Sequence, residues 1–519
     1  MLISGMLRRA AHGFPGKLAL RDNGASLTWG ELETRVSRIA GGLNGLGLKR
    51  GDRVAVLDQN GMAFHDAYLA LPWAGMVMVC INIRWSTSEI ADAINDSGAR
   101  ALLVGPSFLD LAPAIQASCP ALELLIATED GKGHASWAAL AREPGRVPAA
   151  DAGPDALAYI LFTGGTTGRS KGVQISHLAF FSAALMRLHT GDFTHDSVVG
   201  LSLPLFHVSG AAFVGANLAA ASQLELLPSF EPVTAMESVE RAAVTHVGWV
   251  PTMLSMVLNH RDLAAHDLTS LRRVFYGASP MAPSLLRQAM DSLPSARFVQ
   301  YYGMTETCAG GTWLGAQDHD PGEVERLGSI GRTVPGMELE IRRMDETHDV
   351  AAIDEAGEVW MRGPMVTSGY WQRPDATREA LTADGWLRTG DVGRRDAHGF
   401  VYLVDRLKDM IITGGENVYS TEVENVISAM PAVLECAVVG LPDEQWGEVV
   451  CAHIHLRDAA EVSEKAIQDH CRQFLGGYKI PRRIFFSEAP LPKTPAGKIL
   501  KTELRRNGDA AAIASAEAQ

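Results

Sequence analysis

The sequence predicts an α/β protein with a large N-terminal domain of doubly wound sheets plus a small β-barrel, and a smaller α+β C-terminal domain. Short apolar runs rich in β-branched residues alternate with helical patterns through the first 230 residues. From about residue 325, glycines separate short strand-like pieces instead. A chain of 519 residues, 47% of them hydrophobic, can fill several such units.

The alternation is clearest near the N-terminus. Apolar residues recur at helical spacing over 32–46, and Val54–Leu57 is expected to form a buried strand. Ser86 and Glu89 form the capping box of a second helix, and the apolar run 101–104 supplies the next strand. Repeats of this kind pack as a largely parallel sheet.

Two uncharged stretches are long enough to be weighed as membrane spans. The first, between Asp66 and Arg84, contains Pro72 and Gly75, which favour a helix, a break and a buried strand. The second, from Ser197 to Leu224, is interrupted by polar residues and is expected to form a core strand and a helix. We therefore predict no integral membrane segment.

The C-terminal part has a mixed pattern after the glycine-rich segment. A half-buried strand is expected over Cys451–Leu456, and a helix from Ser463 to Leu475. The alanine-rich residues after Arg506 are expected to be disordered. These elements predict a separate α+β domain.

Charge and cysteine content exclude several function classes. The 60 acidic and 46 basic residues give a net charge of −14, the wrong sign for a nucleic-acid binder. Six scattered cysteines form neither a disulfide framework nor a zinc motif, which favours a reducing, cytoplasmic location. The N-terminus has no signal-peptide pattern. The oligomeric state stays open, with a homodimer as one candidate.

The most informative segment runs from Tyr159 to Gly172. An apolar strand feeds a loop with four glycines, three threonines and a lysine, YILFTGGTTGRSKG. Backbone N–H groups, hydroxyls and an ammonium can converge there on a polyphosphate. The loop lacks the Walker A spacing and contains no GxGxxG.

This loop resembles the phosphate loop of the adenylate-forming superfamily, which includes acyl-CoA synthetases, peptide-synthetase adenylation domains and beetle luciferases. Further segments match in the order of that family, and the resemblance covers nearly the whole chain. They are LPLFH (203–207), YGAS (276–279), QYYGMTET (300–307), GWLRTGD (385–391), DRLKDMIITGGEN (405–417) and PKTPAGK (492–498).

The resemblance implies a site for ATP. The groups at the phosphates are Thr163, Gly164, Gly165, Thr166, Thr167, Gly168 and Lys171. Tyr302, with Gly303 and Thr305 of its motif, and the backbone of Gly277, Ala278 and Ser279 lie at the adenine; Asp391 and Arg406 lie at the ribose.

Three residues are implied to be catalytic: Lys498, His207 and Glu306. In the first half-reaction a carboxylate attacks the α-phosphate of ATP, and the ammonium of Lys498 is suited to the charge that develops. Glu306 and Thr166 are the implied Mg²⁺ ligands, because this hard cation prefers carboxylate, hydroxyl and phosphate oxygens.

Within the superfamily, the sequence resembles the carboxylate-CoA ligases. Peptide-synthetase domains carry an aspartate for the substrate amine just after the position of Phe206, where this chain has His207. Residues 197–224 contain no Asp or Glu, so the ammonium of an amino-acid substrate would be buried there without a carboxylate partner. We therefore expect an uncharged acyl tail.

A tunnel for coenzyme A is implied by the same resemblance. Its residues are Gly414, Gly415 and Glu416 in the loop 413–417, with Trp446 and Lys479 as further candidates. No insertion of the kind typical of fatty acyl-AMP ligases lies between Asp405 and Glu416. The alternatives are an acyl-AMP ligase that loads a carrier protein, a non-catalytic acyl- or nucleotide-binding relative, and a luciferase-like oxygenase.

The chain departs from the usual pattern at two positions. Gly164 replaces a serine in the phosphate loop, and Ser420 stands where a proline is usual. The acyl pocket is implied to lie among His207, Val208, Ser209, Ala211, Gly277, Gly303 and residues 308–311. Its substrate is either an aryl or a medium-chain carboxylic acid.

The two half-reactions imply a mobile C-terminal domain. Lys498 and the loop 413–417 must serve one site in turn, and both follow the DRLKD segment. We therefore expect domains at 1–407 and 408–519, with the hinge at Lys408.

Overall fold

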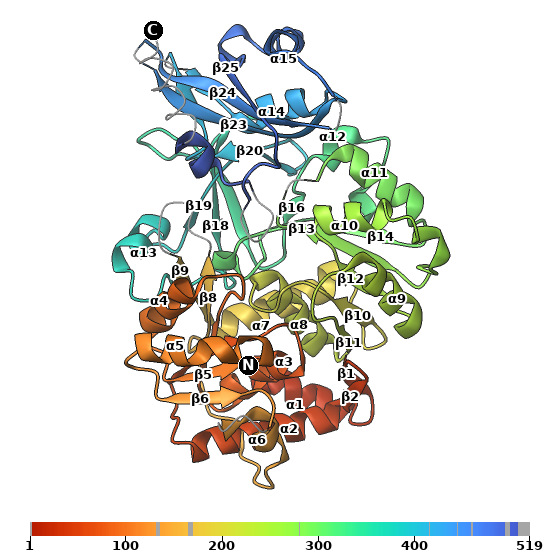
Figure 1. Ribbon diagram of the computed structural model, residues 1–519, viewed down its shortest axis with the longest axis vertical. Coiled ribbons are helices and arrows are strands. Elements are labelled where there is room, and N and C mark those ends of the chain that lie inside the picture. The colour runs from red at the N-terminus through yellow and green to blue at the C-terminus, as the bar shows by residue number, and fades with distance from the viewer. Residues whose placement is uncertain are drawn as a thin grey trace. The chain divides into compact units, whose positions relative to one another are not determined.

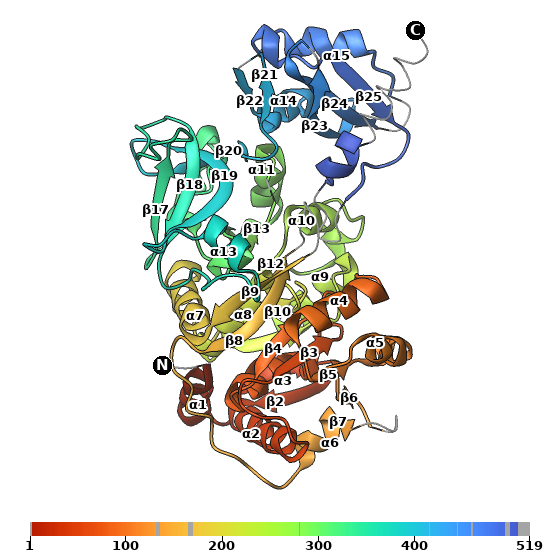
Figure 2. The same cartoon turned by 90° about the vertical axis from the view of Figure 1, so that its left-hand side faces the viewer.

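The computed structural model of the chain divides into two compact units (Figures 1 and 2). The described residues are 3–130, 135–163, 170–279, 281–414, 416–443, 445–457, 460–493 and 499–506. The first unit comprises Met1–Thr163, Ser170–Leu339 and Met361–Leu387. The second comprises mainly Glu340–Trp360 and the chain from Arg388 onward.

The first unit contains two large sheets. One has seven strands in the order β7-β6-β5-β3-β4-β8-β9, parallel except for β9. Its strands are β3 (Arg53–Leu57), β4 (Val77–Cys80), β5 (Ala101–Val104), β6 (Leu124–Ala127), β7 (Ala135–Ser136), β8 (Leu157–Thr163) and β9 (Lys171–Ser176).

The other sheet has nine strands in the order β16-β15-β14-β13-β12-β10-β11-β1-β2. It is parallel from β14 to β1 and antiparallel at both ends. Its strands are β1 (Leu18–Asp22), β2 (Ala25–Thr28), β10 (Val198–Leu201), β11 (Gln223–Leu226), β12 (His246–Gly248), β13 (Arg273–Gly277), β14 (Arg297–Tyr302), β15 (Thr312–Leu314) and β16 (Arg332–Thr333).

Helices cover these sheets and separate them. Helix α3 contacts strands of both sheets, while α7 contacts β9 and packs on α8, which covers β10 and β11 (Figure 2). The helices are α1 (Ile3–Gly13), α2 (Trp29–Gly45), α3 (Met62–Trp73), α4 (Thr87–Ser97), α5 (Ala112–Ser118), α6 (Trp137–Arg142), α7 (His177–Gly191), α8 (Val208–Ala220), α9 (Pro232–Ala242), α10 (Pro251–Leu258), α11 (Pro283–Ser292), α12 (Val324–Leu327) and α13 (Pro374–Ala380). The predicted α/β class is confirmed.

The glycine-rich segment forms an open four-stranded sheet, so the prediction of a small β-barrel is wrong. The strand order β17-β18-β19-β20 follows the chain, with β17 and β20 at the two edges. The strands are β17 (Glu338–Arg342), β18 (Gly357–Arg362), β19 (Leu387–Arg395) and β20 (Val401–Arg406). Glycine spacing predicts turns between short strands, but closure depends on pairing between the first and last strands, which that spacing does not encode.

The second unit also contains a five-stranded sheet with two helices. Its order is β22-β21-β24-β23, and β25 pairs with β24. The elements are β21 (Ile411–Thr413), β22 (Glu416–Val418), α14 (Ser420–Ser428), β23 (Val433–Asp443), β24 (Gly447–Leu456), α15 (Glu464–Cys471) and β25 (Arg483–Ser487). The predicted C-terminal α+β domain is thus confirmed as a fold class.

Two details of this sheet differ from the prediction. The segment from Cys451 to Ile454 is buried throughout rather than half-buried, because apolar clusters cover both faces of β24. Leu491 and Leu504, close to the end of the described chain, contribute to the second cluster. Helix α15 begins after its cap Ser463, as predicted, but ends at Cys471. The residues after Arg506 lie outside the described part.

The N-terminal predictions are confirmed. The helix predicted over 32–46 is α2, which buries Leu32, Val36, Ile39 and Leu43. The capping box of Ser86 and Glu89 is formed at α4, and the strands at 54–57 and 101–104 are β3 and β5.

Both uncharged stretches fold as predicted, as α3 with β4 and as β10 with α8. Within the described ranges, the structure has no helix whose length and apolar character would let it cross a membrane.

Candidate active site

Two antiparallel strands hold the ends of the glycine- and threonine-rich loop. Strand β8 ends at Thr163, β9 begins at Lys171, and these two residues pair across the strands. The Thr163 hydroxyl donates a hydrogen bond to the carbonyl oxygen of Lys171 at 3.4 Å. The residues assigned to the loop itself, Gly164, Gly165, Thr166, Thr167 and Gly168, lie outside the described part of the chain.

A tyrosine that the sequence analysis did not single out joins Lys171 to Glu306. The Nζ of Lys171 lies 4.9 Å from the centroid of the Tyr370 ring, a cation–π contact. The Tyr370 hydroxyl donates a hydrogen bond to Oε1 of Glu306 at 2.8 Å. Burial and the Glu306 carboxylate raise the pKa of Tyr370 above its ordinary value, so the phenol stays protonated and donates.

The backbone around Tyr370 explains why its ring lies between these two residues. The N–H of Thr367 donates to the carbonyl oxygen of Glu306 at 2.7 Å. The N–H of Trp371 donates to the carbonyl oxygen of Gly172 at 2.7 Å. The segment is therefore bonded to β9 on one side and to the Glu306 turn on the other.

Glu306 lies in a short 3₁₀-helix, η3 (Thr305–Thr307), which contacts both β8 and β9. Its side chain is almost fully buried, with 5% of the residue exposed. The next two residues, Cys308 and Ala309, both adopt left-handed backbone conformations, with φ of 50° and 55°. Two such non-glycine residues in succession are strained and need support from the surrounding structure.

A buried arginine supplies that support. Arg187 on α7 is 4% exposed, and its guanidinium donates hydrogen bonds to the carbonyl oxygens of Ala309 at 2.8 Å and Cys308 at 3.5 Å. It also lies over the Tyr301 ring, 5.5 Å from the centroid. Arg187 thus fixes the turn that follows Glu306. A single arginine on an apolar helix gave no sequence signal for this role.

The residues assigned to adenine lie at the carboxyl ends of neighbouring parallel strands. Gly277 ends β13 and Tyr302 ends β14, and Gly277 pairs with Tyr301 in the register. Gly277 has φ of +153°, and a Cβ there would lie 2.2 Å from the Tyr301 carbonyl oxygen, so only glycine fits. Ligands of open α/β sheets bind outside such strand ends.

Their neighbours in sequence share this edge. Ala278 is exposed with a left-handed φ of 63°, and Ser279, Gly303 and Thr305 are half-buried. Because η3 follows β14 directly and contacts β8 and β9, the first unit brings these residues together with Thr163, Lys171 and Glu306.

His207 immediately precedes α8 and is half-buried, with its ring 5.4 Å from that of Phe206. Val208 and Ser209 are half-buried beside it, while Ala211 is 2% exposed. A Cβ at Gly210 would meet the Pro204 carbonyl oxygen at 2.3 Å. The missing side chain therefore lets the first turn of α8 pack against the LPLFH segment that carries His207.

Methionine side chains fill the space beside the glycines of the predicted acyl pocket. A Cβ at Gly310 would lie 2.7 Å from Sδ of Met365 and 3.1 Å from Cε of Met186. A Cβ at Gly311 would lie 2.9 Å from Cε of Met361. These glycines therefore leave room for the flexible methionine side chains to pack closely against the turn.

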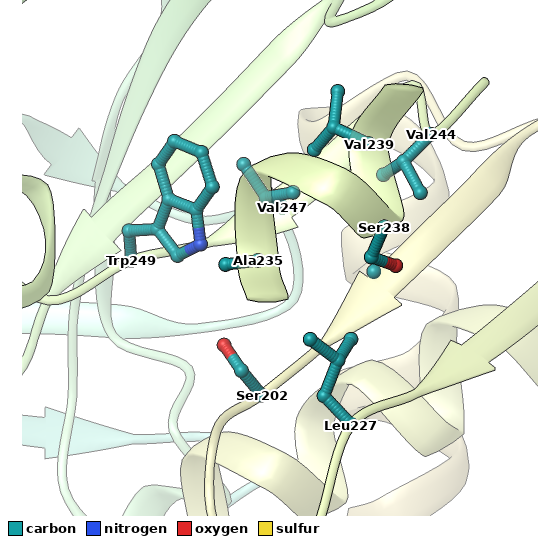
Figure 3. Close-up of a pocket in the computed structure, with 9 residues that line it drawn as sticks. Ser202, Leu227, Ala235, Ser238, Val239, Val244, Val247 and Trp249 are labelled. Atoms are coloured by element: carbon teal, nitrogen blue, oxygen red, sulfur yellow. The ribbon is translucent and has the colours of Figure 1, made fainter. Parts of the chain in front are cut away.

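A cavity in the first unit is too small for a substrate. It measures about 10 Å³, lies between β10, α9 and β12, and has Trp249 on its wall (Figure 3). The Oγ atoms of Ser202 and Ser238 are buried in this region without a hydrogen-bond partner. Its volume matches a single water molecule, and the surrounding residues belong to the core.

Asp391 and Arg406 are brought together in the second unit. They pair across β19 and β20, and Nε of Arg406 lies 2.7 Å from Oδ1 of Asp391. Asp391 is 3% exposed, whereas nearly half of the Arg406 side chain is exposed. The Asp391 N–H donates to the Thr389 hydroxyl at 3.1 Å, which fixes the strand at this point.

Strands β21 and β22 pair as an antiparallel hairpin next to Gly414. Thr413 pairs with Glu416 across β21 and β22, and Gly414 between them has φ of +59°. A Cβ at Gly414 would lie 2.9 Å from the Trp446 ring, and the Gly414 N–H donates to the Trp446 carbonyl oxygen at 2.8 Å. The guanidinium of Arg482 lies over the Trp446 ring, 4.5 Å from its centroid.

The other residues assigned to coenzyme A and to catalysis are an ion-paired lysine, an exposed glutamate and two residues that the structure does not describe. Lys479 is held in an ion pair with Glu422, with 2.7 Å between Nζ and Oε2. Glu416 is exposed. Lys498 and Gly415 lie outside the described residues. Nowhere in the described ranges do three or more His, Cys, Asp or Glu side chains form a group that could hold a metal ion.

The sequence matches two models of known families. The model described as AMP-binding enzyme matches residues 7–371, and the model of the AMP-binding enzyme C-terminal domain matches residues 422–498. The chain belongs to the AMP-binding enzyme family. The predicted membership in the adenylate-forming superfamily is therefore confirmed.

Curated relatives of this AMP-binding enzyme include carboxylate-CoA ligases. It is 36% identical to a feruloyl-CoA synthase from Amycolatopsis sp over 504 residues, which cover 96% of this chain and 97% of the relative. It is also 36% identical to the long-chain-fatty-acid–CoA ligase FadD13 of Mycobacterium tuberculosis H37Rv over 481 residues, 92% of each chain.

Solved structures resemble the AMP-binding enzyme over nearly its whole length. ATP-bound MatB from Rhodopseudomonas palustris aligns with a TM-score of 0.89 at 31% identity, covering 98% of this chain and 99% of MatB. The amide bond synthetase McbA from Marinactinospora thermotolerans aligns with a TM-score of 0.88 at 32% identity, covering 97% and 99%.

We predict that Tyr370→Phe weakens the binding of magnesium–ATP about tenfold, because a hydrogen bond to a charged group contributes about 1.5 kcal/mol or more. The variant keeps the ring beside Lys171 and loses only the hydroxyl that donates a hydrogen bond to Glu306. Isothermal titration calorimetry at fixed Mg²⁺ measures the change. Tyr370→Leu, which also loses the ring, should bind more weakly still.

Tyr402→Phe is a matched control, since the Tyr402 hydroxyl also donates to a carboxylate, that of Asp396 at 3.3 Å. This control should bind as the wild type does. Equal affinities of wild type and Tyr370→Phe would show that Glu306 is oriented without Tyr370.

Proposed function

We propose that this AMP-binding enzyme is an ATP-dependent carboxylate-CoA ligase. The acid and ATP give an acyl-AMP and pyrophosphate, and coenzyme A then gives the thioester and AMP. The observation that carries the proposal is the contact of Tyr370 with both Lys171 and Glu306, because it joins the phosphate loop to the carboxylate assigned to magnesium. The names of the feruloyl-CoA synthase and FadD13 support coenzyme A as the acceptor.

In the first half-reaction, an oxygen of the substrate carboxylate attacks the α-phosphorus of ATP. The bond from that phosphorus to the bridging oxygen breaks, and pyrophosphate leaves. We assign Lys171 and Thr163, with the loop residues between them, to the β- and γ-phosphates. Lys498 is assigned to the negative charge that develops during the transfer.

Glu306 fits a magnesium site of the kind in which one carboxylate acts with phosphate oxygens and water. It is buried, and the Tyr370 hydroxyl orients one of its oxygens. Magnesium bound there would stabilise the negative charge of the phosphates. Thr166 stays assigned to the same ion.

We assign Asp391 and Arg406 to the ribose. The Asp391 carboxylate is held by Arg406 across the strand pair, so its orientation is set before the nucleotide binds. His207, at the start of α8, is assigned to the acyl side of the site. Tyr302 and the backbone of Gly277–Ser279 are assigned to the adenine.

In the second half-reaction, the thiol of coenzyme A attacks the acyl carbon and AMP leaves. We assign the hairpin at Gly414 and Gly415 to the pantetheine, because residues without side chains leave room for a narrow ligand. Trp446 packs against Gly414 and supports the hairpin. Lys479 is held by Glu422, and we retain it only as a residue near the nucleotide of coenzyme A.

The acid is either an aryl or a medium-chain carboxylic acid. The feruloyl-CoA synthase supports an aryl acid, and FadD13 supports a fatty acid without supporting a medium chain length. The packing of Met186 and Met365 beside Gly310 is compatible with both, because methionine side chains readily change shape.

We further propose that the enzyme acts in the cytoplasm, since all six of its cysteines are free thiols. A homodimer stays one candidate for its oligomeric state, which sedimentation of the wild-type enzyme would decide.

Pyrophosphate release over a panel of aryl and fatty acids, with and without coenzyme A, tests the proposed function. We expect release with one class of acid, and a thioester and AMP only when coenzyme A is present. Release that never yields a thioester would instead support an acyl-AMP ligase, and no release with any acid would support a non-catalytic relative.

Replacing Lys498 should separate the two half-reactions. We expect Lys498→Ala to slow acyl-AMP formation by ~10²–10³-fold, the scale for losing one preorganised donor. Thioester formation from supplied acyl-AMP should persist. Lys465→Ala, at an exposed position of α15, is the control and should leave both steps unchanged. Equal loss of both steps in Lys498→Ala would show that the lysine is structural or that it serves both steps.

Fixing the backbone at Lys408 should affect the second step. Lys408 lies in a turn in which the Arg406 carbonyl oxygen accepts the N–H groups of Asp409 and Met410 at 2.9 and 3.0 Å. Proline restricts its own φ and the residue before it. We expect Lys408→Pro to adenylate at nearly the wild-type rate and to form thioester at least tenfold more slowly.

Lys408→Ala removes the side chain but keeps the backbone free, so it should retain both steps. Single-turnover measurement of each half-reaction distinguishes the variants. Equal loss of both steps, or of neither, in Lys408→Pro would contradict a hinge at this position.

A further inference from the structure

Ser420, where the usual family residue is proline, lies at the centre of a buried polar cluster in the second unit. It is 0% exposed and begins α14. Its N–H donates a hydrogen bond to Oδ2 of Asp405, and its hydroxyl donates to Oδ1 of the same carboxylate at 3.0 Å. Asp405 is itself 8% exposed and begins the DRLKD segment.

The same hydroxyl receives a hydrogen bond from a lysine near the end of the described chain. Nζ of Lys501 lies 2.5 Å from Oγ of Ser420 and 2.7 Å from Oε1 of Glu424. Glu424 lies one turn further along α14 and also accepts the N–H of Val438 at 2.7 Å. The ammonium is therefore held between a hydroxyl and a carboxylate that α14 presents together.

The chemistry of this cluster requires a hydroxyl at position 420. A hydroxyl can accept from an ammonium and donate to a carboxylate at the same time. Proline has neither an N–H nor a hydroxyl, so it could not replace either bond to Asp405. A buried carboxylate and a largely buried ammonium that lose a partner are costly. Asp405 and Lys501 thus supply the acceptor and the donor for the hydroxyl of Ser420, which stands where a proline is usual.

A second pair of contacts joins the segment 499–506 directly to the segment 405–409. The guanidinium of Arg505 donates to Oδ1 of Asp409 at 2.9 Å and to the carbonyl oxygen of Lys408 at 3.3 Å. The segment 499–506 is therefore attached to the segment 405–409 directly through Arg505 and indirectly through Lys501 and Ser420. Lys498 precedes the first of these attached residues in the sequence.

We propose that Ser420 and Lys501 are positioning residues for Lys498. By joining the segment that follows the catalytic lysine to Asp405, they restrict where that lysine can lie. The proposal rests on the proposed function, in which Lys498 serves the adenylation step. Neither Ser420 nor Lys501 needs to touch the substrate.

Two substitutions break the hydrogen bond between Lys501 and Ser420, one from each side. Ser420→Ala keeps the N–H bond to Asp405 and loses the hydroxyl that bridges to Lys501. Lys501→Met keeps the length of the side chain and loses its charge. In each variant we expect kcat for acyl-AMP formation to fall about tenfold or more, since small misplacements of a catalytic group are costly. KM for ATP should stay within about twofold.

The matched controls are Lys501→Arg and Lys465→Met. Arginine can donate to the same two acceptors, so Lys501→Arg should recover most of the adenylation rate. Lys465 is exposed on α15, so Lys465→Met should act as the wild type does. Thermal unfolding of every variant shows whether it is folded.

Two readouts decide the proposal. Thioester formation from supplied acyl-AMP should be unchanged in Ser420→Ala and Lys501→Met; loss of both half-reactions by the same factor, or of neither, would overturn the proposal. Amide hydrogen exchange over 499–504 should be faster in both variants than in the wild type, and unchanged exchange would also overturn it. If the wild type forms no acyl-AMP, the proposed function fails, and hydrogen exchange still tests the attachment.

Discussion

The hydrogen bond between Tyr370 and Glu306 is the interaction on which the part of the first unit assigned to the ATP phosphates depends. A carboxylate as buried as that of Glu306 is costly unless hydrogen bonds or a cation compensate it. The Tyr370 hydroxyl compensates one oxygen, and its ring contacts Lys171. One side chain therefore sets the positions of two charges that are assigned to the same polyphosphate.

Backbone bonds make that arrangement rigid before any ligand binds. The segment of Tyr370 is bonded to Glu306 through Thr367 and to β9 through Trp371. Arg187 then fixes the strained turn after Glu306 through two carbonyl oxygens. Preorganised groups of this kind need little reorganisation when the substrate arrives, which is a main source of catalytic power.

The parts of the fold that the sequence predicts are those with local signals. Helix α2, strand β3 and the capping box at Ser86 depend on residues within one element. The closure of a barrel and the covering of both faces of β24 depend on residues far apart in the chain, such as Leu504. No local pattern encodes such contacts, and both were predicted wrongly.

The same distinction applies to the candidate site. Motif order pointed to Lys171, Glu306 and Gly277, and the structure brings their segments together. Tyr370 and Arg187 were missed because each contacts residues that are distant in the sequence, and neither belongs to a motif that indicates a functional role. Ser420 was noted only as a departure; its meaning required the positions of Asp405 and Lys501.

The methionines beside Gly310 bear on how such a scaffold changes its substrate during evolution. Met186 and Met365 occupy the space that a larger residue at position 310 would need. A gain of volume on one side can therefore be matched by a shorter side chain on the other, with the backbone of the turn unchanged. Paired substitutions at position 310 and at a facing methionine therefore offer a route by which the preferred acid could change in size while the protein stays folded.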